Sequence, residues 1–381
     1  MDSFPSEPRE RVNPVYNDNK LKLGVFGLNG PGTVMTTHPD RFLPTWQASL
    51  AVAKACDAAG LEAIVPYSRW KPFGGAGHIT GVTLDTFAWA AAVSASTSYS
   101  GVFATVHAHA VHPLVAAKQG ATIDQISGGR FALNLVVGFY LPEIATFGID
   151  PGSKDDRYDF GEEWVAALKR LWTEDAEVDV EGRYVRIEGG VSTPKPVQKP
   201  SPPIMNAGIS DRGRQLAGRY CDIAFVVSQT EDPAKIAEQV ASYKTFARET
   251  YGRDLQVWGY GLVVQRASRE EAEADLRSFV TEYADVEAVD EFARYMFGAQ
   301  LPEEKLSALR PTIASGGSMQ LCGTATDIAD KLEMMSACGM DGVLLTFVDY
   351  QAGSRSFINA VLPLLEQRGL RAPHVAKEAA E

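Results

Sequence analysis

The sequence predicts an α/β protein built as a single (β/α)8 barrel, with insertions after the fourth and seventh strands. Three observations favour this fold. Short apolar runs alternate with amphipathic stretches, the alternation occurs eight times, and the chain of 381 residues is 45% hydrophobic, which is enough for a large core. Strands that alternate with helical patterns of about 10–15 residues indicate βαβ units and a parallel sheet. Eight such units favour a closed barrel over an open, doubly wound sheet.

The expected strands are short runs of apolar residues bounded by glycine, proline or polar positions. In chain order they cover residues 21–28, 63–66, 101–106, 131–138, 203–208, 222–227, 258–264 and 342–348. The expected helices have apolar residues at helical spacing and cover residues 46–59, 83–95, 113–126, 158–172, 211–219, 232–251 and 354–368. Gly60 is expected to end the first helix, because glycine is favoured just after a helix C-terminus.

Two segments interrupt the alternation of strands and helices. Residues 177–196 alternate polar and apolar side chains like a hairpin and run into a proline-rich connector. Residues 275–315 are helical in pattern but polar, which indicates an insertion. We therefore expect a flexible N-terminal arm over residues 1–20, one barrel over residues 21–370 and a C-terminal tail over residues 371–381.

The composition excludes several classes of partner. The net charge of −12 argues against nucleic acid and anionic membranes, because binding to either needs clustered Lys and Arg. Cys56, Cys221, Cys322 and Cys338 are far apart and form no CxxC pair, so neither disulfides nor a zinc site is expected. No signal peptide opens the chain and no run of 18 apolar residues occurs in it. These features predict a soluble, cytoplasmic protein.

Polar side chains near the ends of the strands are the candidates for chemistry, because barrel active sites lie at the carboxyl ends of the strands. His107, His109 and His112 follow the third strand, but no HExxH motif or matching carboxylate accompanies them, so no metal is expected. No GxSxG motif is present either. Glycines after the first strand leave a dinucleotide-binding fold as a weaker alternative, since no GxGxxG opens a helix. A barrel so poor in acids and nucleophiles favours a bound cofactor.

The best phosphate signal lies after the fifth strand. The segment NAGISDRG places Gly208 and Ser210 where a strand meets a helix, and a helix N-terminus attracts anions. Ser210 could instead serve only as the N-cap of that helix. Arg157 and Tyr158 open the helix after the fourth strand, and a guanidinium can bind phosphate through two hydrogen bonds. Together these residues predict one phosphate site.

The chain resembles the flavin-dependent monooxygenases of the bacterial luciferase-like superfamily, most of all their pyrimidine oxygenase group. The most specific stretch is AAKQGATIDQISGGRFALNLVVGFYLPE, residues 116–143, and the likeness runs from residue 21 to residue 350. The resemblance implies a TIM barrel that uses reduced FMN and O2, with the flavin reduced by a separate NAD(P)H-dependent reductase. It also implies oxygen transfer through a flavin N5-peroxide or N5-oxide.

Residues matched by position acquire expected roles from this resemblance. The implied FMN contacts are Ser68, Arg69, Asn134, Glu143, Arg157, Tyr158 and Ser210. Thr105 and Asn134 match the pair that holds dioxygen beside flavin N5. A hydroxyl and an amide can both donate hydrogen bonds to charge that develops on oxygen. His107 is expected near the barrel opening, where an imidazole could orient substrate or relay a proton.

Several positions depart from the group's pattern. Phe139 and Tyr140 stand where the group has Trp after the glycine, Val137 replaces a threonine, and Ser68–Arg69 replaces an apolar–Lys pair. We therefore expect a substrate other than uracil, such as a heteroaromatic, amide, halogenated or sulfonyl compound. The long loops after the fourth and seventh strands are expected to act as lids, and the protein is expected to form dimers or tetramers. The alternatives are a deazaflavin (F420)-dependent dehydrogenase and a non-catalytic flavin-binding protein.

Overall fold

A closed ring of eight parallel strands forms the centre of the molecule, as predicted. The computed structural model describes residues 12–75, 80–138, 140–150, 152–208, 210–228, 230–297 and 301–375. The ring contains, in order, β1 (Lys22–Phe26), β2 (Ala63–Val65), β3 (Gly101–His107), β4 (Phe131–Val136), β7 (Ile204–Asn206), β8 (Ile223–Phe225), β9 (Gln256–Gln265) and β11 (Gly342–Thr346). Each strand pairs in parallel with the next, and β11 closes the ring on β1.

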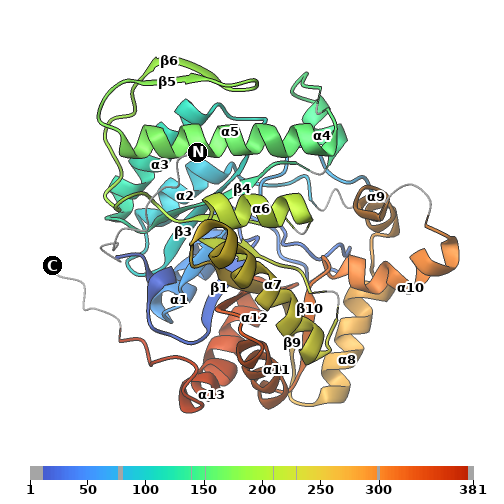
Figure 1. Cartoon of the computed structure of the whole chain (residues 1–381). Coiled ribbons are helices and arrows are strands. Elements are labelled where there is room, and N and C mark those ends of the chain that lie inside the picture. Colours follow the sequence, from blue (N-terminus) through green and yellow to red (C-terminus); the bar gives the residue numbers. More distant parts are fainter. Residues whose placement is uncertain are drawn as a thin grey trace.

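Helices surround this ring on the outside (Figure 1). They are α1 (Trp46–Ala58), α2 (Thr86–Ser94), α3 (Pro113–Ser127), α5 (Lys154–Thr173), α6 (Asp211–Tyr220), α7 (Pro233–Tyr251), α11 (Ala325–Ala337), α12 (Tyr350–Ser356) and α13 (Leu362–Gln367), with a π-helical turn, η3 (Phe357–Val361), between the last two. Gly60 follows the first helix with φ +76°, which confirms its predicted place. Helix α5 begins four residues earlier than expected, because Ser153 and Asp156 form a capping box.

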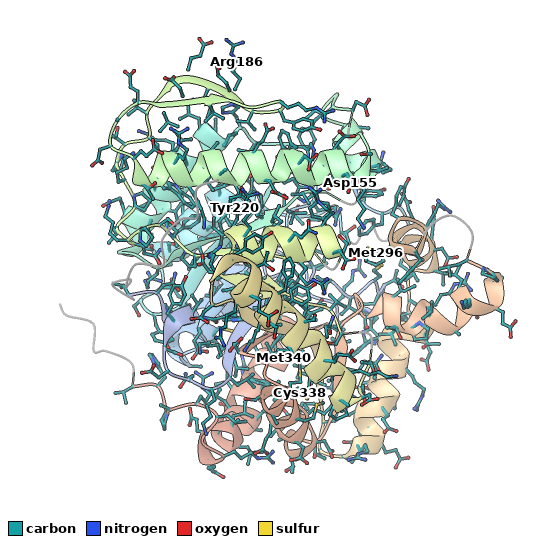
Figure 2. The ribbon with its side chains drawn as sticks, in the orientation of Figure 1. Asp155, Arg186, Tyr220, Met296, Cys338 and Met340 are labelled. Atoms are coloured by element: carbon teal, nitrogen blue, oxygen red, sulfur yellow. The ribbon has the colours of Figure 1, made fainter. Side chains whose placement is uncertain are left out.

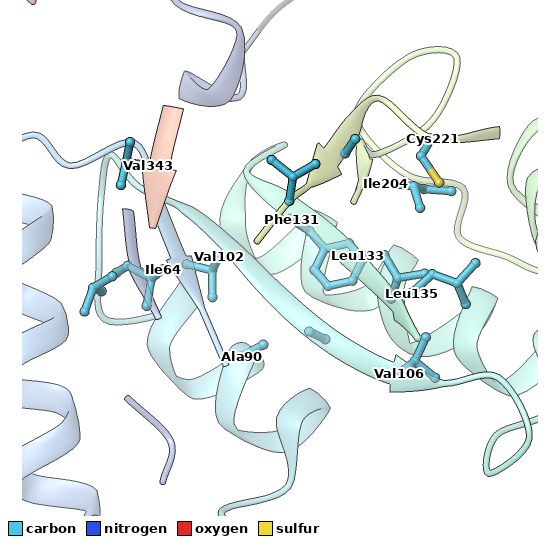
Figure 3. Packing of buried hydrophobic residues seen from close by; sticks show 14 of the residues in the cluster. Ile64, Ala90, Val102, Val106, Phe131, Leu133, Leu135, Ile204, Cys221 and Val343 are labelled. Carbon is cyan, nitrogen blue, oxygen red and sulfur yellow. The ribbon is translucent and has the colours of Figure 1, made fainter. Parts of the chain in front are cut away.

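Alternate residues of each strand face either the ring interior or the outer helices. Those facing outward, such as Ile64, Val102 and Leu133, belong to the large core between the strands and the helices (Figure 3). Inside the ring, four aromatic side chains, Phe26, Tyr67, Phe225 and Tyr260, form a cluster that we call the aromatic floor. The ring centroids of the pairs among them lie 5.4–6.5 Å apart where they are in contact. The floor fills the barrel beneath its open end.

The start of the described chain is packed, in contrast to the flexible arm expected over residues 1–20. A 3-10 turn, η1 (Pro14–Tyr16), places Val15 in the interior cluster of the barrel. Its carbonyl accepts a hydrogen bond from Gln256 Nε2 at 2.9 Å, and Asn13 donates to the Phe131 carbonyl at 3.1 Å. Residues 12–20 therefore plug the amino-terminal end of the barrel, and residues 1–11 lie outside the described chain.

A buried ion pair fastens the other end of the chain to the same face. Arg371 contacts Glu62 at 3.3 Å, and the two side chains are 1% and 0% exposed. Glu62 also accepts hydrogen bonds from the backbone N–H of Leu23 and from Asn17 and Asn19. The expected tail over residues 371–381 thus begins with a buried anchor, while residues 376–381 lie outside the described chain.

One strand has no counterpart among those expected from the sequence. Strand β10 (Met319–Gly323) pairs with β9 over residues 261–265, whereas β8 pairs with β9 over residues 256–258. Because β11 occupies the other side of β9, β10 continues along the side where β8 ends. The ten residues of β9 therefore link the barrel to the segment that follows it.

Both predicted insertions are present. The first contains the expected hairpin, β5 (Val178–Glu181) paired antiparallel with β6 (Arg186–Gly190). It lies beyond α5, with Arg186 at its outer edge directed away from the barrel (Figure 2). The second contains α8 (Arg269–Arg277), a π-helical turn η2 (Ser278–Glu282), α9 (Val286–Phe297) and α10 (Glu303–Ala314). In the part of the chain that the structure describes, every helix is too short or too polar to span a bilayer.

The second insertion shares a hydrophobic cluster with the loops around the barrel opening. Val34 from the loop after β1, Phe73 from the loop after β2 and Tyr140 from the loop after β4 pack with residues of η2, α9 and α10. Backbone hydrogen bonds add to this packing, as from Met35 N–H to the Ala314 carbonyl at 2.7 Å. The insertion therefore packs against one side of the opening.

Candidate active site

Three of the predicted site residues face the interior where β3 and β4 end, at the carboxyl end of the barrel, which we call the mouth. Phe103 and Ala132 belong to the interior cluster. Thr105, His107 and Asn134 follow them at even spacing, so their side chains share the inward face. Thr105 and Asn134 are register partners, and all three side chains are buried. The period of two along each strand thus places these three groups together above the barrel core.

A relay of hydrogen bonds fixes the orientation of Asn134. The Thr105 hydroxyl donates to the Pro66 carbonyl at 2.5 Å, and Asn134 Nδ2 donates to Thr105 Oγ1 at 3.1 Å. A flipped amide would place Oδ1 against a hydroxyl whose only hydrogen is already used, so Nδ2 must face Thr105. Asn134 Oδ1 is buried and has no hydrogen-bond partner among the residues that the structure describes. The pair therefore presents an unsatisfied acceptor and one remaining amide hydrogen.

Glu143 lies on the short helix α4 (Leu141–Ala145) and organises one side of the mouth. Its Oε1 accepts the backbone N–H groups of Trp70 and Lys71, at 2.7 and 3.2 Å. Its Oε2 lies 3.3 Å from Arg69 Nη1 and 3.1 Å from His107 Nδ1. Burial raises the pKa of this carboxyl, but the hydrogen bond from His107 and the charge of Arg69 outweigh it and lower the pKa to about 2. Glu143 is therefore an ionised acceptor.

Arg69 and Ser68 lie in the loop after β2, on the rim of the mouth. The Arg69 guanidinium lies 4.3 Å from the centre of the Phe73 ring and 5.7 Å from that of Tyr140. Burial lowers the pKa of Arg69, and the charge of Glu143 opposes that shift. Tyr140 donates to Glu291 Oε1 of α9 at 2.5 Å, which joins this rim to the second insertion. Phe139 lies outside the described residues.

The predicted phosphate residues come together between α5 and α6. Ser210 Oγ lies 3.1 Å from Tyr158 Oη and accepts the Gly213 N–H, so Ser210 is also the N-cap of α6. Gly208 packs against Gly213: a Cβ on Gly208 would lie 2.6 Å from Gly213 Cα, which requires glycine here. Arg157 lies in the first turns of α5 and does not open that helix as expected. Among the described residues, no carboxylate lies within ion-pair distance of Arg157.

His109 is a neighbour of this group that the sequence did not single out for a role. Its ring stacks on Phe160 of α5, with ring centroids 4.4 Å apart and planes 19° from parallel. Burial, followed by the charge of Arg157, lowers the pKa of His109 to about 4. The guanidinium of Arg157 therefore supplies the positive charge here, and the buried Nδ1 of His109 has no hydrogen-bond partner among the described residues. The sequence shows a histidine two residues after His107. It does not show that this histidine lies near Arg157 in the folded chain.

Other features of the mouth had no clear sequence signal. The hydroxyl of Tyr67, a member of the aromatic floor, is buried and has no hydrogen-bond partner within the described ranges. The backbone N–H groups of Trp70 and Lys71 bind Glu143 without any side-chain motif. His112 proves to be structural, because its Nδ1 accepts the Leu114 N–H and caps α3. Over the described part of the chain, no cluster of three or more His, Cys, Asp or Glu side chains is arranged to hold a metal ion.

Comparison with known proteins agrees with this geometry. Residues 21–342 match the family model described as luciferase-like monooxygenase. The pyrimidine monooxygenase RutA of Escherichia coli O81 (strain ED1a) is 30% identical over 371 residues, which cover 94% of this chain and 95% of that protein. Among solved structures, the long-chain alkane monooxygenase LadA aligns with a TM-score of 0.83 at 18% identity, over 95% of this chain and 94% of LadA.

A second solved structure, riboflavin lyase RcaE with a modified FMN and riboflavin, aligns with a TM-score of 0.81 at 24% identity, over 93% of both chains. At these identities the two structures support the fold alone. The family match covers most of the chain, and the RutA match covers nearly all of it. The chain therefore belongs to the luciferase-like monooxygenase family and is a flavin-dependent monooxygenase.

Proposed function

We propose that this enzyme uses reduced FMN and O2 to oxidise a small organic compound, with the flavin supplied by a separate NAD(P)H-dependent reductase. The observation that carries the proposal is the Thr105–Asn134 pair, buried on adjacent strands with an amide oxygen that lacks a partner. An unsatisfied buried acceptor destabilises the protein by about 1–3 kcal/mol, so the site favours a ligand with N–H donors. A reduced flavin ring offers such donors.

The residues at the mouth fit FMN in both of its parts. The aromatic floor, Asn134 and the rim formed by Ser68 and Arg69 would hold the ring. Arg157, Tyr158, Gly208 and Ser210 would hold the phosphate, whose negative charge would pair with the guanidinium of Arg157. Glu143 fits less directly, because its acceptor positions are already filled by protein donors. We therefore propose that Glu143 does not contact the cofactor itself but holds the residues around it in place.

Bound reduced FMN would supply the electrons that activate dioxygen, and the chain's own residues would stabilise the charge that develops on oxygen. The remaining amide hydrogen of Asn134 would donate to that charge. The Thr105 hydroxyl acts through Asn134, because its hydrogen is used by the Pro66 carbonyl. The insertion packed over the mouth would exclude water. We propose that the substrate is a heteroaromatic, amide, halogenated or sulfonyl compound. We also propose that the enzyme is a homo-oligomer of two or four chains.

A screen with an added FMN reductase tests this function. The enzyme, NADH, FMN and the reductase are incubated under 18O2 with candidate heteroaromatic, amide, halogenated and sulfonyl compounds. We expect one 18O atom in the product, measured by mass spectrometry. A deazaflavin-dependent dehydrogenase would instead turn over with F420 and without oxygen. A non-catalytic flavin-binding protein would bind FMN and leave every compound unchanged.

The phosphate site gives a prediction of its own. Arg157→Gln is expected to weaken binding of FMN by about 10- to 100-fold, because a hydrogen bond to a charged group contributes about 1.5–3 kcal/mol. Riboflavin, which lacks the phosphate, should bind the variant and the wild-type protein equally. Affinities can be measured by fluorescence titration. Arg186→Gln on the exposed hairpin is the control, and an equal loss for both flavins would contradict the assignment.

A further inference from the structure

The carboxylate of Glu143 is filled by protein donors. An ionised carboxylate offers about four acceptor positions. Here Trp70 N–H and Lys71 N–H occupy Oε1, while Arg69 and His107 occupy Oε2. The side chain is 1% exposed. The Glu143 carboxylate is therefore fixed by two segments, the loop after β2 and the end of β3.

This arrangement determines which nitrogen of His107 carries a proton. Glu143 is ionised and can only accept hydrogen bonds, so Nδ1 of His107, 3.1 Å away, must donate. In the neutral imidazole the other nitrogen, Nε2, then has a free lone pair. An orienting carboxylate also stabilises the imidazolium that forms when Nε2 takes up a proton. The pair has the arrangement of a general base and its positioning group.

The place of His107 in the fold puts its imidazole beside the proposed reaction site. His107 is the last residue of β3 and shares the inward face with Thr105, two residues earlier. Two residues along a strand span about 6.6 Å, so the imidazole lies one inward-facing position beyond the Thr105 hydroxyl that contacts Asn134. The imidazole is buried and lies at the carboxyl end of the barrel, beside the Thr105–Asn134 pair.

We propose that His107 Nε2 accepts a proton from the substrate and that Glu143 is the positioning residue that fixes its tautomer. The X–H bond of the substrate breaks, its electron pair stays on X, and the proton forms the Nε2–H bond. The imidazolium is paired with Glu143 and returns the proton to the oxygenated product. This step needs no oxidant of its own. The substrate class narrows to compounds with an acidic N–H or O–H, such as heterocyclic amides, imides and phenols.

The substrate class rests on the proposed function, but the tautomer does not, so the two can be tested apart. The first experiment uses flavin-free protein labelled with 15N in its histidines. The His107 signals are identified by their loss in His107→Gln. We expect the wild-type spectrum to show Nδ1 protonated and Nε2 unprotonated. A wild-type His107 that carries its proton on Nε2 would overturn the proposal.

Glu143→Gln gives the sharper comparison. The backbone donors Trp70 and Lys71 keep the amide oxygen on their side, so the new N–H2 faces His107 Nδ1 and donates to it. The tautomer is then expected to invert, which a merely structural Glu143 would not cause. Glu163→Gln is the matched control, because Glu163 also accepts backbone N–H groups, from Arg183, Tyr184 and Val185, but lies beside the hairpin. Its spectrum should match the wild type.

The second experiment measures turnover of a compound found by the 18O2 screen. His107→Gln and Glu143→Gln are each expected to lower kcat by about 100-fold or more, with FMN affinity within about twofold of wild type. His107→Gln keeps Glu143 in place, which guards against a folding defect in the other variant. Wild-type kcat in His107→Gln would overturn the inference. If wild-type protein fails to bind reduced FMN, the proposed function is wrong, while the tautomer result is unaffected.

Discussion

Asn134→Leu is expected to lower product formation by about 100- to 1000-fold, the effect of removing one preorganised donor to developing negative charge. Leucine has the same number and branching of side-chain heavy atoms as asparagine, but neither the amide hydrogen nor the acceptor. The variant should fold, because the substitution also removes the unsatisfied Oδ1. FMN affinity should change by less than about tenfold, since the phosphate contacts between α5 and α6 remain.

Product and hydrogen peroxide, both quantified in the same reaction, test this expectation. Reduced FMN should still react with oxygen in Asn134→Leu, so peroxide should replace product. Thr105→Ser serves as a conservative control, because it keeps the hydroxyl that bridges Asn134 and the Pro66 carbonyl. Full product yield in Asn134→Leu would mean that the pair has no part in oxygen transfer.

Arg371→Met is expected to lower the free energy of unfolding by about 3–5 kcal/mol, the usual result of leaving one member of a buried ion pair alone. Glu62 is wholly buried and would keep only neutral donors from Leu23, Asn17 and Asn19. Both residues lie at the amino-terminal end of the barrel, far along the strands from the mouth. Flavin binding at low temperature should therefore be unchanged.

Urea unfolding followed by circular dichroism measures this loss. Arg186→Met is the control, because Arg186 pairs with Glu188 on the exposed hairpin, where an ion pair contributes about 0–1 kcal/mol. If both variants unfold at the same urea concentration, the Glu62–Arg371 pair does not anchor the C-terminal segment.

Local sequence patterns were sufficient for the barrel but not for everything attached to it. The runs that became β3 and β4 are long, apolar and bounded by glycine, so their strands could be predicted. Strand β10 is short and alternates buried and half-buried residues, and it forms only because β9 extends past β8. The flexible arm expected over residues 1–20 includes Val15, because a valine in a largely polar segment does not show that the barrel interior will receive it.

In the candidate site, too, local sequence patterns predicted some features and missed others. Thr105 and Asn134 could be predicted as neighbours, because both stand where inward-facing strand positions end. The partners of Glu143 could not, since two of them are backbone N–H groups that any residue would supply. The closeness of His109 to Arg157 depends on how α5 packs against the loop after β3, a relation between segments about 50 residues apart that no local pattern encodes.

The hydrophobic cluster that joins the second insertion to the loops after β1, β2 and β4 bears on how this enzyme's specificity could change. Val34, Phe73 and Tyr140 are core residues of the insertion as well as parts of the loops that frame the mouth. Grafting one loop from a relative would leave a hole or a steric clash in that shared core. New substrate ranges are therefore more readily reached by exchanging the loops and the insertion as one block than by replacing any of them singly.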